Sequence, residues 1–228
     1  MAQGKKYKDA TRSYDGDGVH SIDDATRILS GFPKRKYDET VDLALRLGVD
    51  PRKADEMIRG TVSLPAGTGK AVRVAVFAQG AAAQAALDAG AEFVGAEDLA
   101  EQIEGGMLDF DVTIASPDMM PLVGKLGRVL GPRSLMPNPK TGTVTPDVAK
   151  AVEEFKGGKV EFRTDKFANV HVPVGKVSFA DDDLVTNITS VLEEIKRLKP
   201  AGAKGQYIKK ASISSTMGPS VKLDVSDL

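Results

Sequence analysis

The spacing of apolar residues changes twice along the chain, and this constrains the fold more than any other feature. Apolar residues alternate with polar ones at Val41, Leu43, Leu45 and Leu47, with Thr40, Asp42 and Arg46 on the opposite side. This period of two is typical of half-buried strands. It returns at 160–162, 170–174 and 210–216. Between these ends, short apolar runs alternate with helical stretches, as in a mostly parallel sheet with helices on its faces.

Two kinds of pattern predict two domains. We expect a discontinuous α+β domain with an antiparallel sheet, made of residues 1–66 and 158–228. An inserted α/β domain, three-layered and Rossmann-like but without a glycine fingerprint, should occupy residues 67–157. The expected strands are 41–47, 60–64, 72–76, 92–94, 112–115, 160–162, 170–174, 210–216 and 221–225. The expected helices are 22–29, 50–58, 80–88, 97–104, 147–156 and 184–199.

Cap residues support three of these helices. Ser21 should cap the first, and Thr145 followed by Pro146 should cap the helix at 147–156. Asp181, Asp182 and Asp183 give a negative start to the last helix, and we interpret them as a cap rather than a metal site. Each signal is local, so it predicts where a helix begins.

Charge is distributed unevenly, although the formal net charge is only −1. Residues 67–157 carry 8 Lys and Arg against 12 Asp and Glu, whereas the two ends together carry 23 against 20. Within the ends, residues 195–223 hold seven cations and no carboxylate. A basic surface of this kind suits a polyanionic partner.

The strand in that basic stretch has two different faces. Lys210, Ser212, Ser214 and Thr216 fall on one side, whereas Ala211, Ile213 and Met217 fall on the other. The alternation ends at 217–220, where Gly218 has no side chain to cover the backbone. Cations, hydroxyls and bare backbone suit phosphates and sugars, but a solvated edge strand guarded by lysines has the same composition. These residues alone leave both interpretations open.

Two further stretches bear on function. Lys34, Arg35, Lys36 and Tyr37 combine cations with a ring that could stack on a base, although a solvated loop is the common reading of such a cluster. Residues 65–70 resemble a phosphate loop but lack its first glycine and its Ser or Thr after Lys70, so we interpret them as a linker. A second glycine-rich crossing follows at 156–159. The hinge between domains should involve these glycines: Gly67, Gly69, Gly157 and Gly158.

Several classes of function find no support in the residues. The chain has no cysteine and only two histidines, His20 and His171, and we predict no catalytic residue, no metal site and no cofactor. No apolar run approaches the length of a membrane span, and the first twelve residues are polar and basic, so we expect a cytoplasmic protein with no membrane partner. A small-molecule enzyme using the inserted domain remains as the alternative from another class.

Residues 124–144 carry a long specific motif, Gly-Lys-Leu-Gly-Arg-Val-Leu-Gly-Pro-Arg-Ser-Leu-Met-Pro-Asn-Pro-Lys-Thr-Gly-Thr-Val. It closely resembles the signature of the large-subunit ribosomal protein one family, bacterial type, the protein of the ribosome's mobile stalk. Further matching motifs occur in order at 37–41, 60–65, 162–163, 165–166 and 215–220. The chain departs from the family at Ser134 and Ala168, where glycine is usual. If Ser134 is left-handed, the serine costs roughly 1 kcal/mol.

The resemblance implies an RNA-binding structural protein of the large ribosomal subunit, monomeric when free. It implies binding to stalk rRNA, contact with exit-site tRNA, and repression of translation from the protein's own operon mRNA. It assigns the rRNA contacts to Lys36, Tyr37, Thr40, Asp165, Lys166, His171, Ser214, Thr216, Met217 and Gly218. An RNA chaperone acting outside the ribosome is the nearest alternative.

Overall fold

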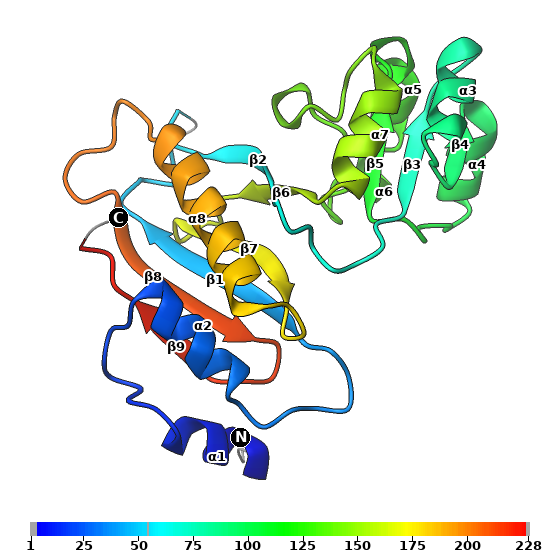
Figure 1. Ribbon diagram of the computed structural model, residues 1–228. Coiled ribbons are helices and arrows are strands. Elements are labelled where there is room, and N and C mark those ends of the chain that lie inside the picture. Colours follow the sequence, from blue (N-terminus) through cyan, green and yellow to red (C-terminus); the bar gives the residue numbers. More distant parts are fainter. Residues whose placement is uncertain (1–3, 54, 227–228) are drawn as a thin grey trace. The chain divides into compact units, whose positions relative to one another are not determined.

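The computed structural model describes residues 4–53 and 55–226, which form two compact units. The first unit joins the residues up to Gly69 with those from Val160 onward, and the second runs from Lys70 to Lys159. The chain therefore crosses between the units twice (Figure 1). Each unit is described below by itself.

The first unit holds an antiparallel sheet in the order β7-β1-β8-β9, and a separate pair, β2-β6. Its strands are β1 (Thr40–Leu47), β2 (Arg59–Ser63), β6 (Lys159–Arg163), β7 (Asn169–Lys176), β8 (Ile208–Ser215) and β9 (Ser220–Leu223). Its helices are α1 (Lys5–Arg12), α2 (Ile22–Ser30) and α8 (Asp181–Arg197). Helices α2 and α8 cover one face of the sheet (Figure 1).

Strand alternation decides which face is covered. Val41, Leu43, Leu45 and Leu47 of β1 are buried, and they pack with the apolar stripe of α8 in one core. Burying each such side chain contributes roughly 1.5–3 kcal/mol. The residues between them point to the other face, which no helix covers in the part of the chain that is described.

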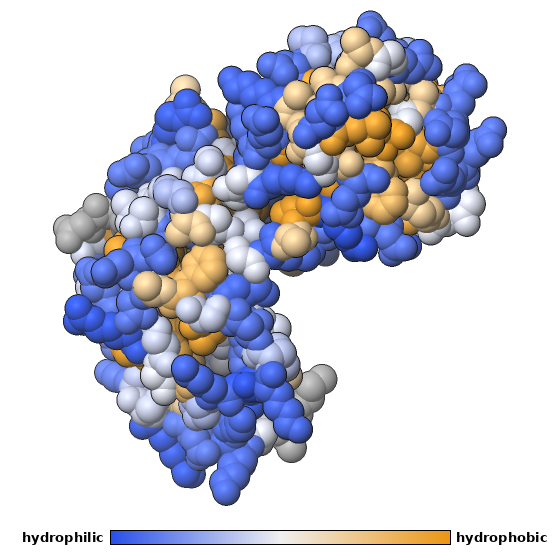
Figure 2. Space-filling view, turned by 45° about the vertical axis from the view of Figure 1, so that its right-hand side comes forward, coloured by the Kyte–Doolittle hydropathy of each residue, from blue (hydrophilic) through white to orange (hydrophobic). Residues whose placement is uncertain are grey.

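The second unit holds a parallel sheet in the order β4-β3-β5. Its strands are β3 (Val74–Phe77), β4 (Phe93–Gly95) and β5 (Val112–Ala115). Its helices are α3 (Ala81–Asp88), α4 (Glu97–Glu104), η1 (Pro117–Met119), α5 (Met120–Lys125), α6 (Gly127–Leu130), η2 (Pro139–Thr141) and α7 (Val148–Lys156). Helices α3 and α7 pack on one face of the sheet, and α4, α5 and α6 on the other. The space-filling view shows hydrophobic patches between largely hydrophilic side chains (Figure 2).

Most expected elements are confirmed, and so is the cap of α2, where Ser21 accepts a hydrogen bond from the N–H of Asp24. The antiparallel sheet at the ends and the parallel sheet in the middle are also confirmed. One helix is wrong: the described residues of 50–58 form turns. Asp50 accepts from the N–H of Arg52, and Glu56 accepts from the N–H of Asp50. Such side-chain bonds to the backbone compete with a helix.

Two caps were misplaced. Helix α7 is capped by Asp147 and not by Thr145. The Asp147 carboxylate accepts a hydrogen bond from the N–H of Lys150, whereas the Thr145 hydroxyl accepts one from the N–H of Asp147, which precedes the helix. Helix α8 already begins at Asp181, so the aspartates form its first turn and Ala180 occupies the cap position without a side-chain bond. The negative charges there still favour the helix dipole.

The two residues that depart from the pattern of the resembled family have an unusual backbone conformation. Among the described residues, the non-glycine residues in the left-handed region are Ser134 (φ 59°) and Ala168 (φ 62°). These are the two positions that the sequence marked as departures from the pattern of the family it resembles. Left-handed backbone costs a residue with a Cβ about 1–2 kcal/mol, so both turns are strained.

None of the helices in the described ranges is long and apolar enough to cross a membrane. Among the same residues, no group of three or more His, Asp or Glu side chains is placed to hold a metal ion.

Candidate nucleic-acid interface

The uncovered face of the first unit's sheet carries polar side chains in cross-strand rows. Asp42 of β1 lies between Pro173 of β7 and Ser214 of β8. The next row along the sheet places Ala44 between His171 and Ser212, and the row after it places Arg46 between Asn169 and Lys210. Three of these side chains, Lys210, Ser212 and Ser214, were expected from the spacing in the sequence to share one face with Thr216.

Asp42 is the carboxylate in the middle of this face. Burial raises the pKa of its carboxyl group above the ordinary value, and the neighbouring charges of His171 and Lys176 partly offset that effect.

Glu39 holds the turn at residues 215–218 against the start of β1. Its side chain is buried, and one carboxylate oxygen, Oε2, accepts from the Ser215 hydroxyl at 2.8 Å and from the N–H of Met217 at 2.9 Å. Arg35 braces the same contact, with Nε 3.3 Å from the other carboxylate oxygen and Nη2 donating to the carbonyl of Met217. A charge-assisted bond to a backbone N–H is stronger than a neutral one, so this turn is fixed.

Thr216 ties the turn to β1 a second time. Its N–H donates to the carbonyl of Thr40 at 3.0 Å, and its hydroxyl bonds to both backbone groups of Thr40. The side chains next to these contacts remain available to a partner. Met217 and Tyr37 are each 54% exposed, and Lys36 is exposed.

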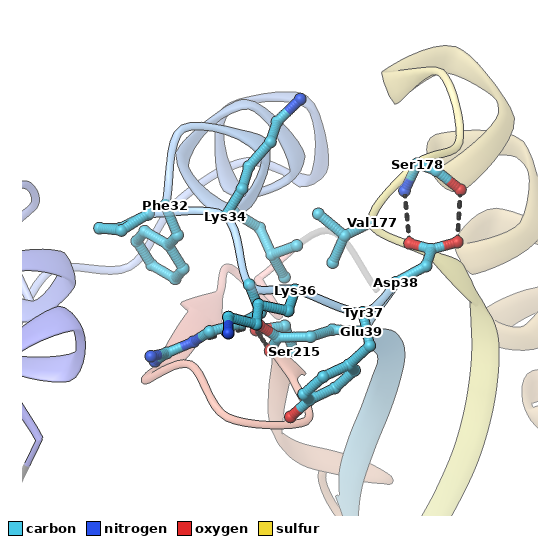
Figure 3. A pocket seen from close by; sticks show the side chains of 12 residues that line it. Phe32, Lys34, Lys36, Tyr37, Asp38, Glu39, Val177, Ser178 and Ser215 are labelled. Atoms are coloured by element: carbon cyan, nitrogen blue, oxygen red, sulfur yellow. Dashed lines mark hydrogen bonds and ion pairs between the residues drawn. The ribbon is translucent and has the colours of Figure 1, made fainter.

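A pocket of about 310 Å³ opens beside this turn (Figure 3). Residues 32–39 supply much of its wall, together with Val177, Ser178 and Ser215. Asp38 does not offer its carboxylate there, because it accepts from the N–H and the hydroxyl of Ser178. The cations Lys34 and Lys36 are exposed on the lining segment, so the pocket is bordered by positive charge.

Gly218 has a packing reason for being glycine. A Cβ there would lie 2.5 Å from the Ser215 hydroxyl oxygen and 3.3 Å from the ring of Phe32. The Ser215 hydroxyl cannot easily move aside, because it donates to Glu39. Any larger residue would therefore disturb the turn before it met a partner.

Met217 lies differently from the sequence expectation. The alternation placed it with Ala211 and Ile213 on the buried side, but β8 ends at Ser215, which is itself buried, and Met217 is exposed. The bonds to Glu39 end the period of two at this point.

A second turn, at residues 165–168, presents the other expected contacts. Asp165 accepts from the N–H groups of Phe167 and Asn169, each at 2.8 Å, and from the side-chain amide of Asn169. Burial acts to raise the pKa of this carboxyl group, but those hydrogen bonds and the charge of His171 hold it below its ordinary value. Asp165 therefore serves the turn, while Lys166 and Phe167 point outward, the latter 65% exposed.

The expected site residues fall into two groups. Lys36, Tyr37, Thr40, Ser214, Thr216, Met217 and Gly218 lie at one end of the sheet. Asp165 and Lys166 lie at the opposite end, where the carbonyl of Ala168 accepts from the N–H of Leu47. The six steps along the strand from Thr40 to Arg46 separate the ends by roughly 20 Å, at about 3.3 Å per residue of strand. His171 lies between the groups on the uncovered face.

The sequence did not single out Glu39 or Phe167, and it named Arg35 only as one cation of the 34–37 cluster. A buried carboxylate such as Glu39 gives no local signal, because its partners at 215–217 are far away in the sequence. Phe167 did give a signal, since a large apolar residue at the centre of a turn is unusual there.

The first crossing is fixed more firmly than its glycines suggest. The side chain of Asn187, fully buried in α8, accepts from the N–H of Ala66 and donates to the carbonyls of Gly67 and Val174. A Cβ at Gly69 would lie 2.8 Å from the ring of Phe179. Gly67 and Gly69 are thus held to the first unit. At the second crossing, the N–H of Gly157 bonds to Glu153, and Gly158 has φ 107°.

Comparison with known proteins gives a consistent result. Residues 29–219 match the model of the ribosomal protein L1p/L10e family. The large ribosomal subunit protein uL1 of a Nocardioides species is 57% identical over 224 residues, which cover 98% of this chain and 93% of that protein. The protein of the same name from Clavibacter michiganensis subsp. michiganensis is 53% identical over 228 residues and covers both chains completely.

Proposed function

Because this chain belongs to the ribosomal protein L1p/L10e family, we propose that it binds the stalk rRNA of the large ribosomal subunit through the uncovered sheet face of its first unit. Membership makes it a structural constituent of that subunit, associated with the ribosome, and not an enzyme. Membership therefore argues against the small-molecule enzyme that the residues alone had left as an alternative.

The observation that carries the proposal is the fixed turn at 215–218. Glu39 and Thr40 hold it so that Met217, Tyr37 and Lys36 are exposed beside the hydroxyl of Thr216. An ammonium group meets phosphate, an aromatic ring or thioether packs on bases and sugars, and a hydroxyl reaches a 2′-OH. A turn that is already ordered loses little entropy on binding, which favours tight recognition.

The contact surface extends along the sheet from this turn. Ser214, Ser212 and His171 lie on the uncovered face, and the Asp165–Ala168 turn adds Lys166 and Phe167 at the far end. An RNA element with two contact regions roughly 20 Å apart would engage both turns at once. In this arrangement Asp165 and Gly218 act through the backbone they shape.

Two finer functions belong to the same proposal. The chain contacts tRNA leaving the exit site, and it represses its own operon by binding an RNA element of the mRNA that resembles the stalk rRNA. Both rest on the family resemblance. A leader fragment of the operon mRNA should compete with stalk rRNA for the protein, and failure to compete would remove the repressor role.

The proposal also covers the domain arrangement. Residues 70–159 form an inserted Rossmann-like α/β domain in a discontinuous RNA-binding domain, and the two crossings form a hinge. The parallel sheet with helices on both faces and the positive φ of Gly158 support this reading. A distance probe spanning the units should report a broad or two-state distribution in the free protein. A single narrow distance would remove the hinge.

The decisive test compares two exposed methionines of the first unit. Met217→Ala should weaken binding to a stalk rRNA fragment about tenfold, roughly 1.4 kcal/mol, while leaving binding to scrambled RNA unchanged. Met57→Ala is the matched control, because Met57 is 38% exposed but lies in the 50–58 segment, away from the turn. Lys210→Ala should instead lower affinity for both RNAs and reduce the salt slope by about 0.7–0.9.

Equal binding by folded Met217→Ala and Met57→Ala would remove the turn from the recognition surface. The nearest alternative, an RNA chaperone outside the ribosome, predicts that the protein does not sediment with ribosomal subunits.

A further inference from the structure

A second basic surface lies in the other unit, where the overall charge is negative. Residues 119–146 contain Lys125, Arg128, Arg133 and Lys140 and no carboxylate, although residues 70–159 hold 12 Asp and Glu in total. All four cations are exposed. They extend from α5 and α6 through the long loop that precedes α7 (Figure 1). We call this segment the 119–146 surface.

With the exception of Lys150, the cations of this unit outside the 119–146 surface are held by partners within the chain. Lys70 and Arg73 meet Asp111, Lys159 meets Glu154, and Lys156 donates to the carbonyl of Gly90. Within residues 4–53 and 55–226, none of the four cations of the 119–146 surface forms an ion pair. Four positive charges are thus left for a partner in a unit rich in carboxylates.

The loop that carries Arg133 and Lys140 is held in one shape by its own residues. Asn138 is the centre: its side-chain oxygen accepts from the N–H of Lys140, its N–H donates to the Thr143 hydroxyl, and its carbonyl accepts from Thr141 and Thr143. Thr141 and Thr143 are buried. The loop then joins β5, since the N–H of Ala115 donates to Thr143 and its carbonyl accepts from Thr145. The cations therefore project from a fixed frame.

The turn beside Arg133 is strained. Ser134 has φ 59°, and the N–H groups of Ser134 and Leu135 bond back to Gly131 and Leu130 at the end of α6. Strained backbone on an exposed turn persists when the surrounding structure requires that path, and such residues concentrate at functional sites. Arg133, the residue before Ser134, is exposed.

From these observations we infer that the 119–146 surface binds RNA phosphates, as a second contact that is separate from the sheet face of the first unit. Exposed cations with no carboxylate among them suit a polyanion, whereas the fully buried core of a protein interface is depleted in charged residues. Arginine adds a fork that matches phosphate in two bonds. The segment contains no aromatic residue and no histidine, so it has no ring to stack on a base. The contact follows the backbone of RNA and does not read its sequence.

The test uses the full chain with all four cations replaced by glutamine: Lys125→Gln, Arg128→Gln, Arg133→Gln and Lys140→Gln. Binding to a stalk rRNA fragment and to scrambled duplex RNA is titrated with salt. Both affinities should fall by the same factor, about tenfold or more at low salt, and the salt slope should fall by up to about 3. The single change Lys140→Gln has a matched control in Lys150→Gln, which removes the same charge from an exposed lysine of the same unit. Only the first should change the slope.

Arg133→Lys keeps the charge and should retain the slope, which separates charge from loop shape, and circular dichroism checks folding. An unchanged slope in the quadruple variant overturns the inference. Reduced sedimentation with ribosomes, at unchanged affinity for free RNA, also overturns it and assigns the surface to an acidic protein. The outcome is distinct from that of Met217→Ala, which concerns discrimination between the two RNAs.

Discussion

The turns at 215–218 and 165–168 present their side chains alike but are held by carboxylates from different places in the chain. Each exposes a large apolar side chain, Met217 in one and Phe167 in the other, and each is held by a carboxylate that accepts backbone N–H groups. Asp165 belongs to the turn that it holds. Glu39 lies 178 residues before the N–H of Met217 that it accepts. The first turn therefore depends on the tertiary fold, whereas the second is built from residues 165–168 and the next residue, Asn169.

The comparison indicates what the two carboxylates do. Negative groups on an RNA-binding face repel phosphate, yet both occur beside the expected contacts. Their oxygens are occupied by N–H and O–H donors, so they shape the backbone that presents neighbouring side chains. We expect Glu39 and Asp165 to matter for RNA binding only through the turns.

The largest effect should come from Glu39→Ala. It leaves the Ser215 hydroxyl, the N–H of Met217 and the guanidinium of Arg35 without their buried partner, so we expect a loss of about 3 kcal/mol in the free energy of unfolding. Urea denaturation measures this loss. Glu39→Gln keeps one oxygen acceptor and should cost less. If Glu39→Ala lowered the free energy of unfolding by less than Asp165→Ala does, the turn at 165–168 would contribute more to stability than the turn at 215–218, which would contradict this comparison.

Asp165→Ala should cost about 1–2 kcal/mol, since the turn is more exposed and its donors can bond to water instead. The effect depends on pH in a defined direction. The pKa of Asp165 is lowered in the folded protein, so its stabilisation is present above the pKa of the unfolded chain and is lost as pH falls through the folded value.

Acid titration of stability checks that sign. Between about pH 5 and pH 2 the parent should lose more stability than Asp165→Asn, because asparagine does not titrate over the ordinary range of an aspartate near 3.9. Parallel curves would show that the Asp165 carboxylate does not hold the turn.

The smallest effects concern the two left-handed residues. Ser134→Gly should stabilise the protein by about 1 kcal/mol, because Ser134 is exposed and glycine removes only the strain. Ala168→Gly should give less than about 0.5 kcal/mol, since Ala168 is 4% exposed and its buried methyl group is lost. Thermal unfolding of both variants measures the difference. A larger gain at Ala168 would mean that the Asp165 turn is under more strain than its hydrogen bonds indicate.

These contrasts also explain what the sequence predicts. The period of two in β1 and β8 and the cap at Ser21 depend on neighbours in the chain, so they could be predicted. The helix expected at 50–58 was wrong because Asp50 and Glu56 bond to nearby backbone instead. The competition between these side-chain hydrogen bonds and a helix is also local, but helix propensity and apolar spacing do not show which of the two structures is more stable.

The spacing of residue types along the sequence could not predict contacts between residues that are far apart in the chain. Nothing near Glu39 indicates a bond to Met217, and nothing near Asn187 indicates its bonds to Ala66 and Gly67. For the same reason the packing role of Gly218 could not be separated from a role in RNA approach. The resemblance to the family supplied the candidate residues, and the structure supplies the contacts that distinguish presenting groups from supporting ones.

A double-mutant cycle tests the central claim most directly. Affinity for the stalk rRNA fragment is measured for the parent, Glu39→Gln, Met217→Ala and the double variant, with folding checked for each. If Glu39 acts by holding Met217 in place, the loss caused by Glu39→Gln should largely disappear in the Met217→Ala background, with a coupling energy of about 1 kcal/mol. Losses that add within about 0.5 kcal/mol would contradict the account, because Glu39 would then act on RNA binding independently of the turn.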